Sequence, residues 1–261
     1  MTKRSSAAFV CGKSLGLMPS HREKSGEWHI FENAELVAEH GAKWLCDLAS
    51  VRDGQFAICL SGGSTPRRLY RHLADNMTVS RAPWDHIHWF WGDERFVPHD
   101  DPASNYRMAY DELFSRVPIS KDRLHPIPTH GLSPQQAATS YQALLQRFYG
   151  NTQLEVDRPI FDVTLLGIGE DGHTASLFPD SPTPQETRQW VLAVVGAAAQ
   201  PRITLTYPVL DSSRNLAFLA TGEKKKNILS RIRTGDRSLP AARIRPIGDL
   251  YWFVDRAAMG D

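Results

Sequence analysis

The sequence predicts an α/β fold built on a mainly parallel sheet, and two observations support this prediction. Short apolar runs typical of strands alternate along the chain with segments whose apolar residues recur at helical spacing. Several of these runs end in glycine-rich or charged turns, which is where ligands bind in open α/β sheets. Such alternation is typical of βα units whose helices pack on the sheet.

Length and composition narrow the possible functions. The chain has 261 residues, 41% hydrophobic and 23% charged, as in ordinary soluble domains. Its net charge of +1 gives no global attraction to nucleic acid or to an anionic membrane. No apolar run approaches the ~18 residues of a membrane span, and the three cysteines lack metal-type spacing and fit a reducing compartment. We therefore expect a small-molecule partner, with no nucleic acid and no membrane.

The N-terminus differs in composition from the rest of the chain. The first 22 residues contain four basic residues and no acidic one. Both a transit peptide and an ordinary tail have this composition, and the tail is favoured because no clear amphipathic, Arg-rich helix is present. We expect a flexible tail over residues 1–25 and a single catalytic α/β domain over residues 26–261.

The first elements lead into a candidate anion site. Apolar spacing predicts a strand at 28–30, a helix at 34–48 and a strand at 55–60. A glycine turn follows, in which Thr65 suits the N-cap and Pro66 the first position of a helix through about Asp75. Backbone N–H groups converge at such a turn, and the helix dipole favours an anion there.

This turn is either a phosphate pocket or a plain tight βα turn. It lacks the GK[ST] of a nucleotide-binding loop, so a nucleoside triphosphate is not expected. Two adjacent glycines between serines favour the anion pocket. The residues expected to bind the anion are Ser61, Gly62, Gly63, Ser64 and Thr65.

A second polar turn follows the aromatic strand expected at residues 87–91. It carries Asp93, Glu94 and Arg95, which form either a wall of the site or a solvated charged loop. Residues 96–103 are expected as a loop, with Ser104 capping a helix through Leu113. A metal site with the neighbouring histidines is not expected, because no ligand spacing is present and strand alternation turns Asp93 away from them.

The central stretch is residues 161–179. A buried strand at 161–166 leads into Gly167, Gly169 and Gly172, where the backbone can adopt positive φ. These glycines also match the dinucleotide pattern GxGxxG, but closely spaced prolines leave no room for the helix that this pattern requires. Asp171 and His173 lie inside the turn, and His173 is either a satisfied turn histidine or a base suited to proton transfer near neutral pH.

The remaining elements are predicted by similar patterns. They are a capped helix from Ser133 to about Phe148, strands at 190–195, 202–206, 215–220 and 251–254, and a helix after Lys224 to Lys226. The three lysines are expected to form a solvated helix face rather than a binding patch. If the sheet is parallel, the three polar turns share one edge, which suits phosphate capture at one end of a small molecule and proton transfer at the other.

Four sequence motifs resemble those of the glucosamine-6-phosphate isomerase/6-phosphogluconolactonase family and occur in the same order as in that family. They are LSGGSTP, WGDERFVP with SN shortly after, GIGEDGHTASLFP and PRITLT, and the resemblance covers roughly residues 27 to 256. In the deaminase branch the histidine precedes a stretch ending in NEP, whose glutamate serves ring opening and isomerisation. Here that stretch is SLFP, which has no carboxylate and favours the lactonase branch.

The resemblance implies a Rossmann-like, three-layer fold and a cytoplasmic enzyme of the oxidative pentose phosphate pathway, without cofactor or metal. A monomer or small homo-oligomer is expected. It also implies that the Ser61–Thr65 turn binds the 6-phosphate of a sugar lactone with Arg95 and Arg202 and that His173 is the base. Asp171 is expected to orient either the imidazole or the substrate hydroxyls. Supporting roles are expected for Asp93, Glu94 and Gly172. The alternatives are an amino-sugar phosphate deaminase and a non-catalytic sugar-phosphate sensor.

Overall fold

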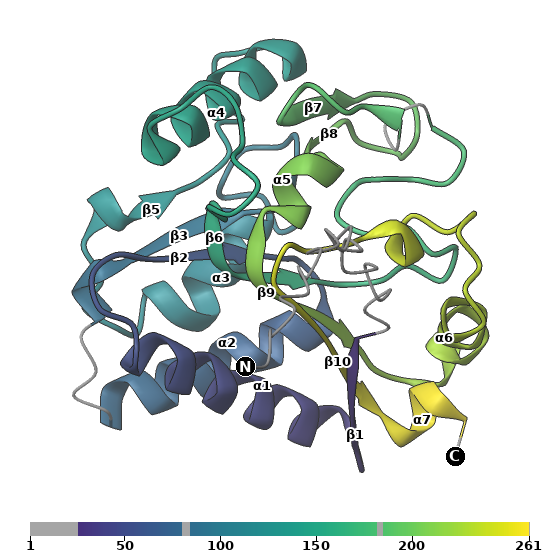
Figure 1. Ribbon diagram of the computed structural model, residues 1–261. Helices are drawn as coiled ribbons and strands as arrows, with labels where there is room; N and C mark the ends of the chain where they lie inside the picture. The colour runs from purple at the N-terminus through teal and green to yellow at the C-terminus, as the bar shows by residue number, and fades with distance from the viewer. Residues whose placement is uncertain (1–25, 80–83, 182–184, 261) are drawn as a thin grey trace, which may run out of the picture.

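A seven-stranded sheet forms the centre of the molecule in the computed structural model, which describes residues 26–79, 84–181 and 185–260 (Figure 1). All of its strand pairs are parallel, which confirms the predicted sheet type. In spatial order the strands are β1 (Glu27–Phe31), β10 (Asp249–Asp255), β9 (Ser213–Ala220), β6 (Phe161–Leu166), β2 (Phe56–Leu60), β3 (Ile87–Trp91) and β5 (Leu124–His125). The flexible-tail expectation for residues 1–25 lies outside the described residues.

Helices cover both faces of this sheet, so the three-layer prediction is confirmed. α1 (Ala34–Ser50) and α2 (Ser64–Val79) pack together on one side, and α4 (Pro134–Tyr149) and α5 (Tyr207–Asp211) lie on the other (Figure 1). The shorter helices are α3 (Asn105–Ala109), which continues into a π-helical turn at Tyr110–Phe114, α6 (Lys226–Arg233) and α7 (Arg256–Met259). Every residue of β2 and β6 is buried, as strands sandwiched between two helical layers must be.

Local sequence signals explain the helix starts. The hydroxyl of Ser133 accepts the backbone N–H of Gln136, and Oε1 of Gln136 accepts the backbone N–H of Ser133, so the predicted capping box of α4 is confirmed. The predicted cap at Ser104 is also confirmed, because its hydroxyl accepts from the N–H of Arg107. The predicted cap at Thr65 is wrong: α2 begins one residue earlier, at Ser64.

A second, smaller sheet lies beside the first and was not predicted. Its antiparallel strands are β4 (Asp93–Arg95), β8 (Arg202–Leu205) and β7 (Val191–Val194). Two of the strands expected for the parallel sheet therefore pair elsewhere. Hydrophobic spacing reports that a segment is extended, but carries no information on which sheet it joins. β4 directly follows β3, and residues of β4 and β8 line one pocket together with the turns that follow β2 and β6.

Candidate active site

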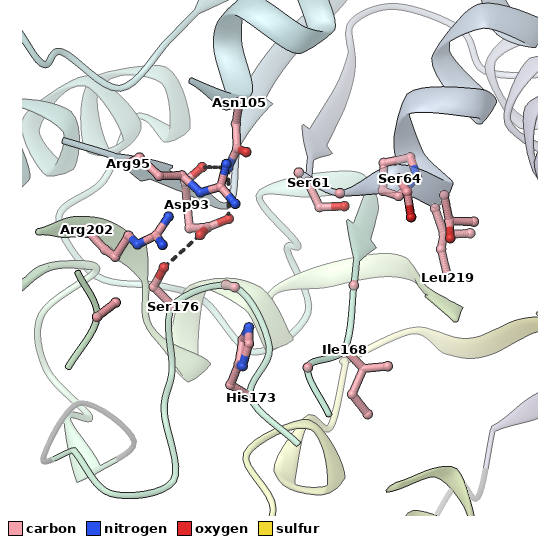
Figure 2. A pocket seen from close by; sticks show the side chains of 18 of the residues that line it. Ser61, Ser64, Asp93, Arg95, Asn105, Ile168, His173, Ser176, Arg202 and Leu219 are labelled. Atoms are coloured by element: carbon pink, nitrogen blue, oxygen red, sulfur yellow. Dashed lines mark hydrogen bonds between the residues drawn. The ribbon is translucent and has the colours of Figure 1, made fainter. Parts of the chain in front are cut away.

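The three polar turns meet, as expected, at one pocket of about 360 Å³ (Figure 2). Turns after β2, β3 and β6 supply most of its wall, and Arg202 of β8 and residues of α3 and β9 complete it. The predicted site residues that line it are Ser61, Gly62, Gly63, Ser64, Thr65, Asp93, Arg95, His173 and Arg202. The other three predicted site residues, Asp171, Glu94 and Gly172, are not among the residues that line it.

His173 is oriented by Asp171. Its Nδ1 lies 2.6 Å from Oδ1 of Asp171, and the same carboxylate oxygen accepts the backbone N–H of His173 at 3.1 Å. Partial burial opposes ionisation of Asp171, but these hydrogen bonds and the attraction to the ring outweigh it and hold the pKa of Asp171 below its ordinary value. An ionised Asp171 can only accept, so Nδ1 carries the proton and Nε2 is left with a lone pair for a reacting proton.

The glycines of this turn serve three different purposes. Only Gly172 has positive φ, at +85°, so the expectation of positive φ at Gly167 and Gly169 is wrong. A Cβ at Gly169 would collide with the His173 ring and the Asp171 carboxylate, so this glycine makes room for the hydrogen-bonded pair. A Cβ at Gly167 would lie 3.8 Å from the nearest atom, the carbonyl oxygen of Gly62, which is an ordinary contact. The motif therefore reflects the pocket and not a dinucleotide loop.

The turn after β2 has the features of an anion site. It delivers the N-terminus of the 16-residue helix α2 to the pocket wall, where unpaired N–H groups and the helix dipole favour negative charge. The hydroxyl of Ser61 lines the same wall, is buried and has no hydrogen-bond partner among the residues that the structure describes. A buried hydroxyl is rarely left unpaired, so a ligand is expected to supply its partner.

Two arginines face each other on the small sheet. Arg95 of β4 and Arg202 of β8 are directly paired in register, and like charges in such pairs are unfavourable unless an anion lies between or near them. Arg95 donates to the carbonyl of Ala103 at 2.7 Å, whereas Nε of Arg202 is buried and finds no partner within the described part of the chain. Burial, followed by repulsion from Arg95, lowers the pKa of Arg202. Both observations indicate a binding position for negative charge.

Glu94 supports the wall without reaching the pocket. It is 1% exposed, and its carboxylate accepts the backbone N–H groups of Arg95, Asn105 and Tyr106 and the hydroxyl of Ser104. Burial raises the pKa of Glu94 to about 7, although each of these hydrogen bonds favours the ionised form. Glu94 thereby fixes the start of α3 against β4, so the turn forms a wall of the pocket, and the alternative of a solvated charged loop is wrong for this residue.

The pocket residues that the sequence reasoning missed include Asn105, Ser176 and Lys225. Asn105 donates to the carbonyl of Asp93 at 2.9 Å and lies so close to Gly62 that a Cβ there would collide with it. Ser176 donates to Oδ2 of Asp93 at 2.7 Å. Lys225 lines the pocket and burial lowers its pKa, while the side chain of Lys224 is 82% exposed. Lys224 is therefore solvated, whereas Lys225 faces the pocket, and the sequence alone does not distinguish these two positions.

Metal and membrane features were sought in the described ranges 26–79, 84–181 and 185–260. Within them, no group of three or more His, Cys, Asp or Glu side chains is arranged to hold a metal ion. In the same residues, no helix has both the length and the apolar character to cross a bilayer.

Comparison with known proteins identifies the family. A profile described as glucosamine-6-phosphate isomerases/6-phosphogluconolactonase matches residues 32–252. The chain belongs to this family. Within it, the chain is 40% identical over 215 residues to a protein of Nostoc sp. named 6-phosphogluconolactonase, an alignment that covers 81% of this chain and 87% of that one. It is also 40% identical to the human 6-phosphogluconolactonase, over 86% of each chain.

Solved structures of the glucosamine-6-phosphate isomerase/6-phosphogluconolactonase family share the fold. The 6-phosphogluconolactonase from Thermotoga maritima superposes with a TM-score of 0.75 at 31% identity, covering 88% of this chain and 99% of that chain. The predicted family resemblance and the α/β fold are both confirmed by these findings.

Proposed function

We propose that this chain hydrolyses 6-phospho-D-glucono-1,5-lactone to 6-phosphogluconate in the oxidative pentose phosphate pathway, in the cytoplasm. One observation carries the proposal: the hydrogen-bonded pair His173–Asp171 and an anion site meet at one pocket. In that anion site the hydroxyl of Ser61 has no partner among the described residues. Relatives that align over more than four-fifths of the chain are named for this activity. A monomer or small homo-oligomer suffices, since the residues invoked all come from one chain.

The phosphate is assigned to the Ser61–Thr65 turn. The N–H groups at the start of α2 and the unpaired hydroxyl of Ser61 offer donors to its oxygens. Lys225 lines the same pocket and adds a positive charge. Gly62 supports this assignment, since its lack of a side chain lets Asn105 pack closely against the turn.

The ester is assigned to the neighbourhood of His173. The oxygen of a water molecule attacks the lactone carbonyl carbon while Nε2 of His173 removes a proton from that water. The tetrahedral intermediate then collapses, the bond between this carbon and the ring oxygen breaks, and His173 returns the proton to the departing oxygen. Asp171 stabilises the transient imidazolium and keeps Nε2 directed at the substrate. No cofactor is needed, because acyl transfer to water requires only a base and donors for the oxyanion.

The two arginines are assigned to the ester end, which departs from the expectation that they bind phosphate. Figure 2 shows Arg95 and Arg202 on one side of His173, and Ser61 and Ser64 on the other. A guanidinium on the arginine side suits the carbonyl oxygen as it gains negative charge, and then the product carboxylate. The pocket thus receives a substrate that is anionic at one end and becomes anionic at the other.

The proposal is tested by a hydrolysis assay at controlled pH on 6-phospho-D-glucono-1,5-lactone, with the spontaneous rate subtracted. Enzyme-dependent hydrolysis that saturates with substrate is the expected result. Ammonia release from glucosamine 6-phosphate without lactone hydrolysis would overturn the proposal in favour of a deaminase. Binding of 6-phosphogluconate with no hydrolysis above the spontaneous rate would overturn it in favour of a sensor.

A further inference from the structure

The loop that follows His173 contains a residue in an unfavourable backbone conformation. Ala175 has φ of +48°, the one non-glycine residue with positive φ among those that the structure describes. The left-handed region crowds the Cβ of an L-residue against the following carbonyl, so alanine adopts it only when neighbouring contacts hold it there. Ala175 lies two residues after His173 and lines the same pocket.

Before Ala175, the chain is held by the turn at the end of β6. The backbone N–H of Gly169 donates to the carbonyl of His173 at 2.8 Å, and the hydroxyl of Thr174 donates to the carbonyl of Gly167 at 2.9 Å. These bonds tie His173 to the large parallel sheet.

After Ala175, the chain is held by the small sheet. The hydroxyl of Ser176 donates to Oδ2 of Asp93 on β4 at 2.7 Å, and its backbone N–H donates to the hydroxyl of Thr204 on β8 at 3.1 Å. Ser176 is 1% exposed, so water offers these groups little competition. Asp93 is itself fixed by Asn105. Ala175 is therefore the junction between two anchored segments.

We infer that Ser176, bound to Asp93, is a positioning residue that holds the His173 imidazole at a fixed separation from Arg95 and Arg202. The inference rests on the proposed function, because it gives Ser176 a role in that same reaction. The base belongs to one sheet and the guanidiniums to the other, and both must reach a single ester group. The strained peptide at Ala175 is maintained by the bonds of Ser176, and it sets the angle at which the histidine turn meets the arginine wall.

The first test is Ser176→Ala. The expected result is a fall in kcat on the order of tenfold with KM changed less than about twofold, since small misplacements of reacting groups are costly to rate. Ser181→Ala is the matched control: its hydroxyl donates to the carbonyl of Phe178 in the same loop, away from Asp93, and its kcat should equal that of the wild type. A wild-type kcat in Ser176→Ala, measured well below its melting temperature, would overturn the inference.

The second test asks whether Ser176 acts through the backbone. Adding Ala175→Gly to Ser176→Ala should restore kcat by about threefold or more, because glycine adopts positive φ without strain. The ring signals of His173 in an NMR spectrum should shift in the single variant and return toward wild type in the double variant. If Ser176 instead bonded the substrate directly, KM would rise and glycine would restore nothing, and that result would overturn the positioning role.

Failure of this inference differs from failure of the proposed function. If the wild type does not hydrolyse the lactone, the proposed function is wrong. If the wild type is active and His173→Ala is not, while Ser176→Ala resembles the wild type, only the positioning role is wrong.

Discussion

The two sheets of this protein differ in what they contribute. The parallel sheet buries every residue of its inner strands β2 and β6, and its strand ends carry the Ser61–Thr65 turn and His173. The small antiparallel sheet has three short strands and carries Arg95 and Arg202 as directly opposed like charges. The parallel sheet therefore has the fully buried inner strands that are usual in stable proteins. The small sheet contains a pair of like charges, which is unfavourable unless negative charge lies nearby. Loss of a residue should therefore affect activity and stability differently in the two sheets.

The largest effect is expected at the parallel sheet. His173→Ala should lower kcat by about 10²- to 10⁴-fold, the usual contribution of a general base. Binding of 6-phosphogluconate, measured by calorimetry, should change by less than about threefold, because the phosphate contacts survive. A kcat within about threefold of wild type would remove His173 from the role of base.

Asp171→Asn tests the same His–Asp pair with a side chain of nearly the same size and shape. An amide can donate to Nδ1 of His173, which moves the ring proton to Nε2 and blocks proton removal from water. We expect a large loss of kcat with nearly unchanged melting temperature, because the Asp171 side chain is 51% exposed. An active Asp171→Asn would show that the tautomer is set in another way.

The small sheet should respond with lost activity and no lost stability. Arg202→Ala should lower kcat/KM by about 10- to 100-fold, as expected for a hydrogen bond to a charged group. Its melting temperature should equal or exceed that of the wild type, because the repulsion with Arg95 disappears. The comparison variant Lys225→Ala should mainly raise KM, since it faces the pocket wall assigned to phosphate. If Arg202→Ala raised only KM, the guanidinium would belong to the phosphate instead.

A pair of glycines sharpens the comparison within one turn. Gly169→Ala should lower kcat by about tenfold or more, because the new methyl group displaces the hydrogen-bonded His173 and Asp171. Gly167→Ala places its methyl in an ordinary 3.8 Å contact and should leave kcat within about threefold of wild type. Equal effects from the two variants would contradict the packing explanation.

The smallest effect is expected at the edge of the parallel sheet, far from the site. Arg123 can only donate, so Nε2 of His88 accepts from it at 2.6 Å, and Nδ1–H of His88 donates to Nε2 of His125 at 2.8 Å. Both rings must then be neutral. Burial, followed by the repulsion that a second charge beside His88 would meet, lowers the pKa of His125 to about 4.

This lowered pKa has a defined consequence for stability. Between the ordinary histidine pKa of about 6.5 and the folded value, the unfolded chain binds more protons, so stability is full above that range and falls as the pH drops through it. After allowance for solvent screening we expect a loss of about 1–2 kcal/mol, measured by urea unfolding at several pH values. His125→Phe should weaken the dependence of the free energy of unfolding on pH without altering kcat. An equally steep change in that variant would assign it to other groups.

The sequence predicted those features that depend on neighbouring residues. The cap at Ser104, the capping box at Ser133 and the glycine turn before α2 are local patterns, and the structure confirms them. Contacts between distant segments could not be predicted in the same way. The pairing of Arg95 with Arg202 and the closeness of Asn105 to Gly62 join segments far apart in sequence, and hydrophobic periodicity carries no information on such pairs.

The site shows the same division. His173 and Asp171 are two residues apart, so a turn was enough to predict their contact. Ser176 is only three residues from His173, yet its partner Asp93 lies on the small sheet, which was itself not predicted. The position of Lys225 could not be predicted, because the sequence does not show which side of the helical segment after β9 faces the pocket.

The strand order also has a consequence for how the protein is made. β1 lies at an edge of the large sheet, and its neighbour there, β10, is the last strand that the ribosome releases. During translation β1 therefore stays without its β10 partner until residues 249–255 have emerged. A nonsense codon before Asp249 would remove β10, and with it the pairing of both β1 and β9 to that strand.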